Sequence, residues 1–189
     1  MKELIEYAEI LTSVAFRVGL SNNPKGNALV VQMKDVSPDA PPRWNKMLRT
    51  TVSERATFLE SGDLLLLMRG GKYFAIHLQN VPFPAVASQH FFILRCGPAL
   101  LPQFLAWQLN HGPVQQYFLQ KDAGSIQRSL RRADVESLPL AVPPLQEQQL
   151  FASLAETCHR QNQALRTRLE LNQQLMDGLA FSLYAKNKG

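Results

Sequence analysis

The sequence predicts an α+β fold, in which a mixed, strand-rich domain is followed by one long coiled-coil-type α-helix. Up to residue 142, short apolar strands and short helices follow one another without the regular alternation of a doubly wound α/β sheet. From Leu145 to Tyr184 the chain has no Pro and only one Gly, Gly178, and it is rich in Gln, Leu, Glu and Ala. We therefore place a domain at residues 1–142 and a helical segment at residues 143–189.

The elements of the domain follow from apolar runs and the breakers between them. Loops are expected at 19–27 and at 35–46, where Gly, Asn and Pro cluster. The expected elements are a strand at 28–33, a hairpin of strands 64–68 and 73–78 around Gly70–Gly71, a strand at 90–95, a helix from Pro102 to Gly112, a helix at 113–121, a helical turn at 131–138 and a closing strand at 138–142. Four aromatic residues are assigned to the core: Phe91, Phe92, Phe104 and Trp107.

The helical segment carries an apolar stripe. Pro144 suits the first turn of a helix, and the forty residues that follow span about 60 Å. Apolar residues recur at an eleven-residue offset, which is typical of a nearly straight pairing helix; they are Leu154, Leu165 and Met176, with Cys158 and Leu169 beside them. A domain of this size cannot cover such a stripe along its whole length, so we expect it to pack against another helix.

Positive charge is concentrated in the middle of the chain. The whole chain has a net charge of +5, but between Arg43 and Arg132 eleven Lys and Arg face four acids, giving +7 there and −2 in the remainder. Such a distribution suits a polyanion such as nucleic acid, although a solvated basic surface is the alternative.

Three segments of this region are candidates for DNA contact. The segment from residue 121 to 132 combines cations with Gln and Ser, which can contact bases and phosphates. The hairpin tip places two cations beside glycines, which allow the backbone to approach DNA closely. The 35–46 loop carries two more cations around Trp44, and the alternative role of Trp44 is to pin the loop to the core. The candidate residues are Arg43, Lys46, Arg69, Lys72, Lys121, Ser125, Gln127, Arg128, Arg131 and Arg132. For each segment the alternative is an ordinary solvated surface.

The sequence offers little for catalysis. His77, His90, His111 and His159 show no metal-ligand spacing, and there is no glycine fingerprint for a nucleotide, so no metal or cofactor is expected. A nuclease site built from Lys34 with Asp35 or Asp63 is a weak alternative, because Gln32 stands where a stronger metal ligand is needed. The absence of a membrane-length apolar run or a secretion signal, together with two unpaired cysteines, favours a cytoplasmic protein.

The order of several motifs resembles the specificity subunits of Type I restriction-modification systems. In both, the closing strand is followed by a proline pair, an acidic residue and Gln at the start of the long helix, here Pro143, Pro144, Glu147 and Gln148. The family's central strand and the helix after it resemble "LESGDLLLLMRGG" and "LLPQFLAWQLN". Its closing and entry segments resemble "AGSIQRSLRRADVESLPLAVP" and "YAEILTSVAFRVG". These motifs extend over nearly the whole chain. A typical member has two recognition domains and two antiparallel long helices, so this sequence resembles half of one.

The resemblance implies a non-catalytic subunit that reads double-stranded DNA, while methyltransferase (modification) and endonuclease subunits do the chemistry. Because a second long helix is missing, it also implies a homodimer that addresses a two-part site. Two other readings stay open. One is a stand-alone DNA-binding regulator or an orphan remnant of such a system. The other is a coiled-coil scaffold whose basic domain binds protein or RNA.

Overall fold

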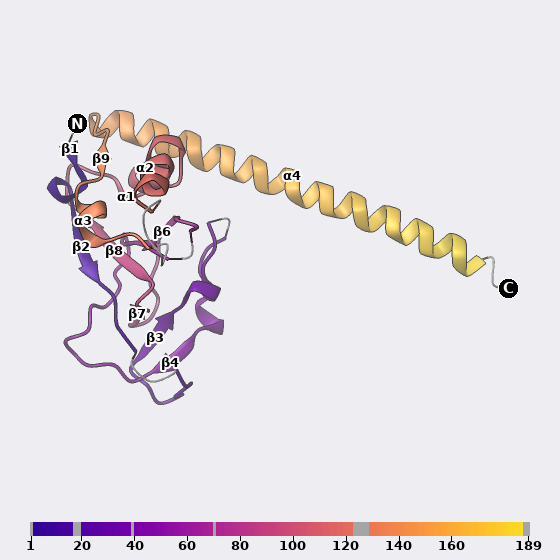
Figure 1. Cartoon of the computed structure of the whole chain (residues 1–189). Coiled ribbons are helices and arrows are strands. Elements are labelled where there is room, and N and C mark those ends of the chain that lie inside the picture. Colours follow the sequence, from indigo (N-terminus) through magenta and orange to yellow (C-terminus); the bar gives the residue numbers. More distant parts are fainter. Residues whose placement is uncertain (1, 17–19, 39, 70, 123–128, 187–189) are drawn as a thin grey trace. The chain divides into compact units, whose positions relative to one another are not determined.

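The computed structural model describes residues 2–16, 20–38, 40–69, 71–122 and 129–186. The chain divides into two compact units, Met1–Ala152 and Ser153–Gly189, which we call the first and the second unit. Among the described residues, every strand and three short α-helices lie in the first unit, and Figure 1 gives the element labels used below. The predicted α+β class, with a long C-terminal helix, is confirmed.

A four-stranded antiparallel sheet forms the centre of the first unit. Its strands are, in spatial order, β2 (Ala8–Thr12), β8 (Phe91–Cys96), β5 (Leu64–Leu67) and β6 (Ala75–His77). The predicted hairpin is therefore present as β5 and β6, with Leu65 opposite Ile76. Its second strand is shorter than expected, and β2 was not predicted.

A three-stranded sheet lies beside it. Strand β3 (Ala28–Val31) pairs antiparallel with β4 (Leu48–Thr50) on one edge and parallel with β7 (Ala85–Ala87) on the other. These three strands group together at the end of the first unit away from α1 and α2 (Figure 1). Strands β4 and β7 were not predicted, because both are three residues long and β7 consists of Ala, Val and Ala.

The two faces of the central sheet bury different sets of side chains. Leu64 and Leu66 belong to a core cluster that includes Phe104 and Phe118 of the helices. Leu65 and Leu67 point the other way, into a cluster that contains residues of β3 and β7. Successive side chains of a strand alternate between faces, so a sheet covered on both sides needs an uninterrupted apolar run. This explains the four consecutive leucines.

The helices of the first unit are short. They are α1 (Pro102–Leu109), α2 (Gly112–Asp122) and α3 (Arg132–Glu136), and all three correspond to predicted segments. The predicted closing strand is present as β9 (Pro139–Leu140), which pairs with β1 (Lys2–Glu3). The aromatic prediction is confirmed, since Phe91, Phe92 and Phe104 are buried and Trp107 packs partly buried against the same cluster as Phe104.

A buried ion pair fixes the turn before β5. Gly62 has a φ of 101°, a left-handed conformation that glycine adopts without strain, and Asp63 follows it with 1% exposure. The Asp63 carboxylate accepts two hydrogen bonds from Arg95, at 2.8 Å from Nε and 2.9 Å from Nη2, and one from the Glu60 amide. Asp63 therefore has a structural role here, as a link between the turn and β8.

The long helix α4 (Leu145–Lys186) begins directly after Pro144, as predicted. Its first turns belong to the first unit, where the Gln148 side chain is fully buried. Gln148 Nε2 donates to Ala99 O and Pro143 O, at 2.9 and 2.8 Å, and its Oε1 accepts from Leu101 N at 2.9 Å. One side chain thus joins the start of α4 to the loop that leads into α1.

Candidate nucleic-acid interface

Two of the predicted basic segments lie side by side. Arg69, in the connection between β5 and β6, forms an isolated antiparallel bridge with Ser129, and Leu130 N donates to Met68 O at 3.0 Å. The hairpin tip and the segment that leads into α3 therefore form one continuous surface, although some sixty residues separate them in sequence. We call the exposed cations on it, Arg69, Lys72 and Arg131, the basic surface.

Two other predicted cations beside this surface are already engaged by acids. Arg132 Nε lies 2.7 Å from Glu136 Oε1 within α3. Lys121 Nζ lies 3.9 Å from Asp134 Oδ1 and 5.2 Å from the centre of the Tyr117 ring. Both side chains remain nearly half exposed, so a phosphate can still approach them, but their charge is partly balanced from within the unit.

Three of the predicted contact residues, Ser125, Gln127 and Arg128, lie outside the described residues. The cations of the 35–46 loop are described and lie on a separate segment, between β3 and β4. Trp44 packs partly buried against the cluster between the two sheets, and Arg43 and Lys46 on either side of it are exposed. Trp44 thus pins the loop to the core, which was one of the two predicted alternatives for it.

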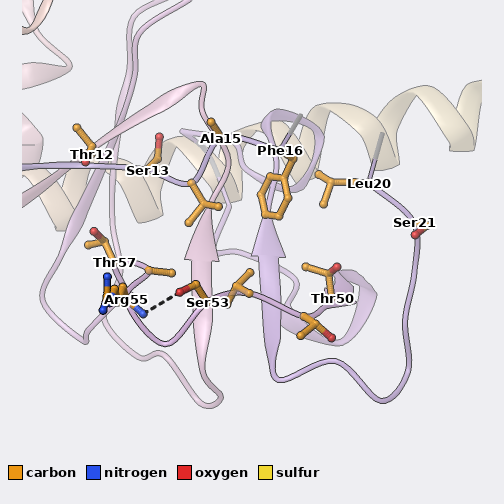
Figure 2. Close-up of a pocket in the computed structure, with 14 residues that line it drawn as sticks. Thr12, Ser13, Ala15, Phe16, Leu20, Ser21, Thr50, Ser53, Arg55 and Thr57 are labelled. Carbon is orange, nitrogen blue, oxygen red and sulfur yellow. Dashed lines mark hydrogen bonds between the residues drawn. The ribbon is translucent and has the colours of Figure 1, made fainter. Parts of the chain in front are cut away.

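A hydroxyl-rich hollow was missed in the sequence. It has a volume of about 710 Å³ and lies between the chain after β2 and the chain after β4. Figure 2 shows its lining, which comprises Thr12, Ser13, Val14, Ala15, Phe16, Leu20, Ser21, Thr50, Thr51, Val52, Ser53, Arg55, Ala56 and Thr57. The Arg55 amide donates to Ser53 Oγ at 3.2 Å. Hydroxyls beside one guanidinium suit contacts with phosphate or sugar oxygens. The Thr and Ser residues of segment 50–57 were the feature of the sequence that could have indicated this hollow.

The predicted stripe of α4 is exposed in the second unit. Leu154, Leu165, Leu169 and Met176 expose 54 to 69% of their surface, and Cys158 is also exposed. Leu179 and Leu183 continue the stripe, since they follow Met176 by three and seven residues on the same helical face, and both are more than half exposed. These two residues were not singled out from the sequence.

The described residues hold no group of three or more His, Cys, Asp or Glu that could bind a metal ion. Cys96 is not an activated thiol either, because burial, aided by the charge of Asp63, raises its pKa to about 12. Burial also lowers the pKa of His77. Among the described residues, no helix is long and apolar enough to cross a membrane.

Removing charge from the basic surface is expected to weaken DNA binding. In the double variant Arg69→Ala and Arg131→Ala, the loss of two phosphate contacts should reduce the slope of log affinity against log salt by about two. If either residue reads a base, preference at one position should also fall by about 1–3 kcal/mol. Arg168→Ala, an exposed Arg of the second unit, is the matched control. Unchanged affinity and salt slope in the double variant would exclude this surface.

Comparisons with known proteins give matches among solved structures alone. No protein-family model matches the chain, and no curated protein does. A chain from a structure of the assembly and conformational transition of a type I R-M system matches with a TM-score of 0.64 and 18% identity, over 86% of this chain and 38% of that one. The HsdS subunit from Thermoanaerobacter tengcongensis matches with a TM-score of 0.61 and 17% identity, over 87% of this chain and 38% of that one.

The Type-I restriction-modification system S subunit from M. genitalium matches with a TM-score of 0.55 and 15% identity, over 93% of this chain and 43% of that one. This chain thus spans about two fifths of the length of the structures it matches. At such low identity the likeness shows the fold. The resemblance predicted from the order of the motifs is confirmed at that level, and the chain has the fold of Type I specificity subunits.

Proposed function

We propose that this chain is a non-catalytic specificity subunit that recognises a double-stranded DNA sequence in a Type I-like restriction-modification system. The observation that carries the proposal is the basic surface, where the bridge between Arg69 and Ser129 joins the hairpin tip to the segment of Arg131 on a fold shared with S subunits. Cations in such an arrangement can follow the phosphate backbone and reach guanine edges in the major groove. The exposed Arg43 and Lys46 would add further phosphate contacts.

The second part of the proposal concerns assembly. The stripe of α4 exposes seven large apolar or sulfur-containing side chains along one face, namely Leu154, Cys158, Leu165, Leu169, Met176, Leu179 and Leu183, and such a surface is normally covered. An identical chain is the partner we propose, because two copies related by a two-fold axis would bury the same face of each. An antiparallel pair would address two inverted half-sites. A helix of a methyltransferase subunit is the other candidate for this face.

The enzyme partners are also part of the proposal. One matched chain comes from work on the assembly of a type I R-M system, so modification and endonuclease subunits are the expected partners of a protein with this fold. A stand-alone DNA-binding regulator with the same fold is the alternative. Pull-down of methyltransferase and endonuclease chains with the tagged protein would support the first reading.

Selection of bound fragments from random duplex DNA tests the central proposal. We expect an enriched sequence made of two inverted parts, retained at physiological salt, because specific complexes keep a base-dependent component of affinity. Binding that shows no enrichment and disappears at moderate salt would contradict it, and would favour the scaffold that binds protein or RNA through a basic domain.

The purified chain is expected neither to methylate nor to cleave DNA when S-adenosylmethionine, ATP and magnesium are supplied. The assay measures methyl transfer and strand breaks on a duplex that contains the selected sequence. Lys34→Ala serves as the control, since Lys34 is the centre of the nuclease alternative. Activity that copurifies with the wild-type chain and is lost in that variant would contradict the expectation.

A further inference from the structure

The exposed stripe of α4 contains two rows of residues within the second unit, and each row repeats every eleven positions. The first row is Leu154, Leu165 and Met176, and the second row is Cys158, Leu169 and Ala180. At about 100° per residue a row turns by only about 20° in eleven positions, and the second row lies about 40° from the first, so the two rows run side by side. All six residues are exposed, and Figure 1 shows α4 as one continuous helix over these positions.

The sequence around the middle of this stripe is nearly symmetric about Thr167. Segment 161–173 begins with Gln-Asn, ends with Asn-Gln and has Leu-Arg-Thr-Arg-Leu at its centre. Of the six pairs of residues equally far from Thr167 in this segment, four are identical: Gln161 and Gln173, Asn162 and Asn172, Leu165 and Leu169, and Arg166 and Arg168. Two antiparallel copies related by a two-fold axis place residues equally far from that axis opposite each other. The segment therefore matches itself in an antiparallel pair whose axis lies at the level of Thr167.

This position of the axis also brings the two rows of the stripe into contact. Each residue of the first row then lies opposite a residue of the second row in the other copy, the three pairs being Leu154 with Ala180, Leu165 with Leu169, and Met176 with Cys158. The members of each pair lie at equal angles, about 40° or less, on either side of the centre of the stripe. Both the levels and the directions of these side chains therefore suit the same register.

Two asparagines interrupt the stripe, and this register places them opposite each other. Asn162 and Asn172 are exposed and lie about 40° on either side of the centre of the stripe. An amide buried against an apolar side chain loses its hydrogen bonds, whereas two facing amides can donate to and accept from each other. An axis at Leu165 would place Asn172 opposite Cys158, and an axis between residues 170 and 171 would place it opposite Leu169. Both of these shifts leave amides unpaired.

We propose that a second copy of this chain pairs antiparallel with α4 in a single register, with the two-fold axis at the level of Thr167, and that hydrogen bonds between Asn162 of one copy and Asn172 of the other select this register. The inference rests on the proposed function, which supplies the homodimer. It adds the residues that favour a second copy over the helix of another subunit, because a foreign helix would need amides at the same two levels. Arg166 and Arg168 lie about 80° from the centre of the stripe, so their like charges stay in water and cost little.

A double-mutant cycle on the two asparagines tests the register. Asn162→Leu and Asn172→Leu should each raise the dissociation constant of the dimer about tenfold, because either change leaves two amides facing leucines. The combined variant should dissociate less than the wild type, because both layers then consist of Leu opposite Leu. Gln174→Leu, at an exposed position on the far side of the helix, is the matched control and should change nothing.

Sedimentation equilibrium of the full chain measures the dissociation constants in this cycle. The prediction depends on the sign of the coupling, since each single change weakens the dimer and the second change reverses the effect of the first. Additive effects of the two substitutions would mean that the asparagines do not meet, and would overturn the proposed register.

Cross-linking between two distinguishable chains measures the register directly. In a Cys158→Ser background, one chain carries Leu165→Cys, and a second chain, made heavier by a tag, carries Leu169→Cys. After mixing and oxidation we expect disulfides mainly between a light and a heavy chain, because these two positions lie opposite each other. A mixture of Leu165→Cys and Met176→Cys chains, which an axis between residues 170 and 171 would link, is the control and should give none.

The other outcomes separate the register from the homodimer. Light chains linked mainly to each other would place the axis at Leu165, and links in the control mixture would place it between residues 170 and 171. Either result, or a dimer that forms no disulfide in the first mixture, would overturn the register and leave the homodimer standing. A wild-type monomer in the same sedimentation experiment would contradict the assembly part of the proposed function, and the register with it, so the two failures are distinguishable.

Discussion

Gln148→Glu is expected to lower the melting temperature of the first unit by about 10 °C, which corresponds to about 3 kcal/mol in the free energy of unfolding. The wild-type amide donates to Ala99 O and Pro143 O and accepts from Leu101 N in a fully buried position. A carboxylate keeps the acceptor but has no donor, so two carbonyl oxygens would lose their partner and face a buried negative charge. Thermal unfolding followed by circular dichroism measures the change.

Gln146→Glu is the matched control, because it makes the same chemical change two residues earlier at an exposed position. A negative charge in the first turn of a helix is favourable, so this variant should be as stable as the wild type or slightly more so. The deficit of Gln148→Glu should also shrink as the pH falls, since burial raises the pKa of the introduced carboxyl and its protonated form can donate. Equal stability of the two variants at neutral pH would contradict the role assigned to Gln148.

Leu165→Asp together with Leu169→Asp is expected to convert a dimer into monomers. Light scattering of the wild type should give about twice the chain mass of 21.3 kDa, and the double variant should give the chain mass itself. Both leucines are more than half exposed, so the free chain tolerates the change, while two desolvated carboxylates in a paired helix would not be tolerated. The structure of the first unit should be unaffected.

DNA binding should follow the change in assembly. A dimer binds its second half-site intramolecularly, so the double variant should lose about 100-fold in affinity for the two-part site and little for a single half-site. Leu171→Asp is the control, because Leu171 is equally exposed but lies on another side of the helix, 200° from Leu169 at 100° per residue. A wild-type monomer at tens of micromolar would contradict the homodimer.

Cross-linking tests the direction of the paired helices. In an antiparallel pair whose two-fold axis lies at the level of Thr167, Cys158 lies opposite Met176 of the other copy, so the two Cys158 thiols are about 27 Å apart along the helix. Cys158 should then form no disulfide between copies, whereas Leu165→Cys combined with Leu169→Cys in a Cys158→Ser background should form one on oxidation. A parallel pair would cross-link through Cys158 in the wild type.

The candidate interface could be predicted only as separate pieces. Arg69 was predicted to contact DNA because it stands beside glycines, and Arg131 because its segment combines cations with Ser and Gln. Nothing local indicated that residues 69 and 129 are bridged, because that pairing is made by backbone groups sixty residues apart.

The sequence by itself determined the elements whose signals are local. The run Leu64–Leu67 forms a strand, and the proline-free segment after Pro144 forms a helix. Backbone geometry and side-chain period decide both within a few residues, whatever the segments pack against. Tertiary structure alone decided that β4 and β7 are strands, since segments of three residues, with Ala in β7, have too little intrinsic preference and depend on β3 for their hydrogen bonds. Tertiary structure also decided that Gln148 is buried, although it is polar and lies between two exposed neighbours in a helix. Its hydrogen-bond partners come from the loop before α1.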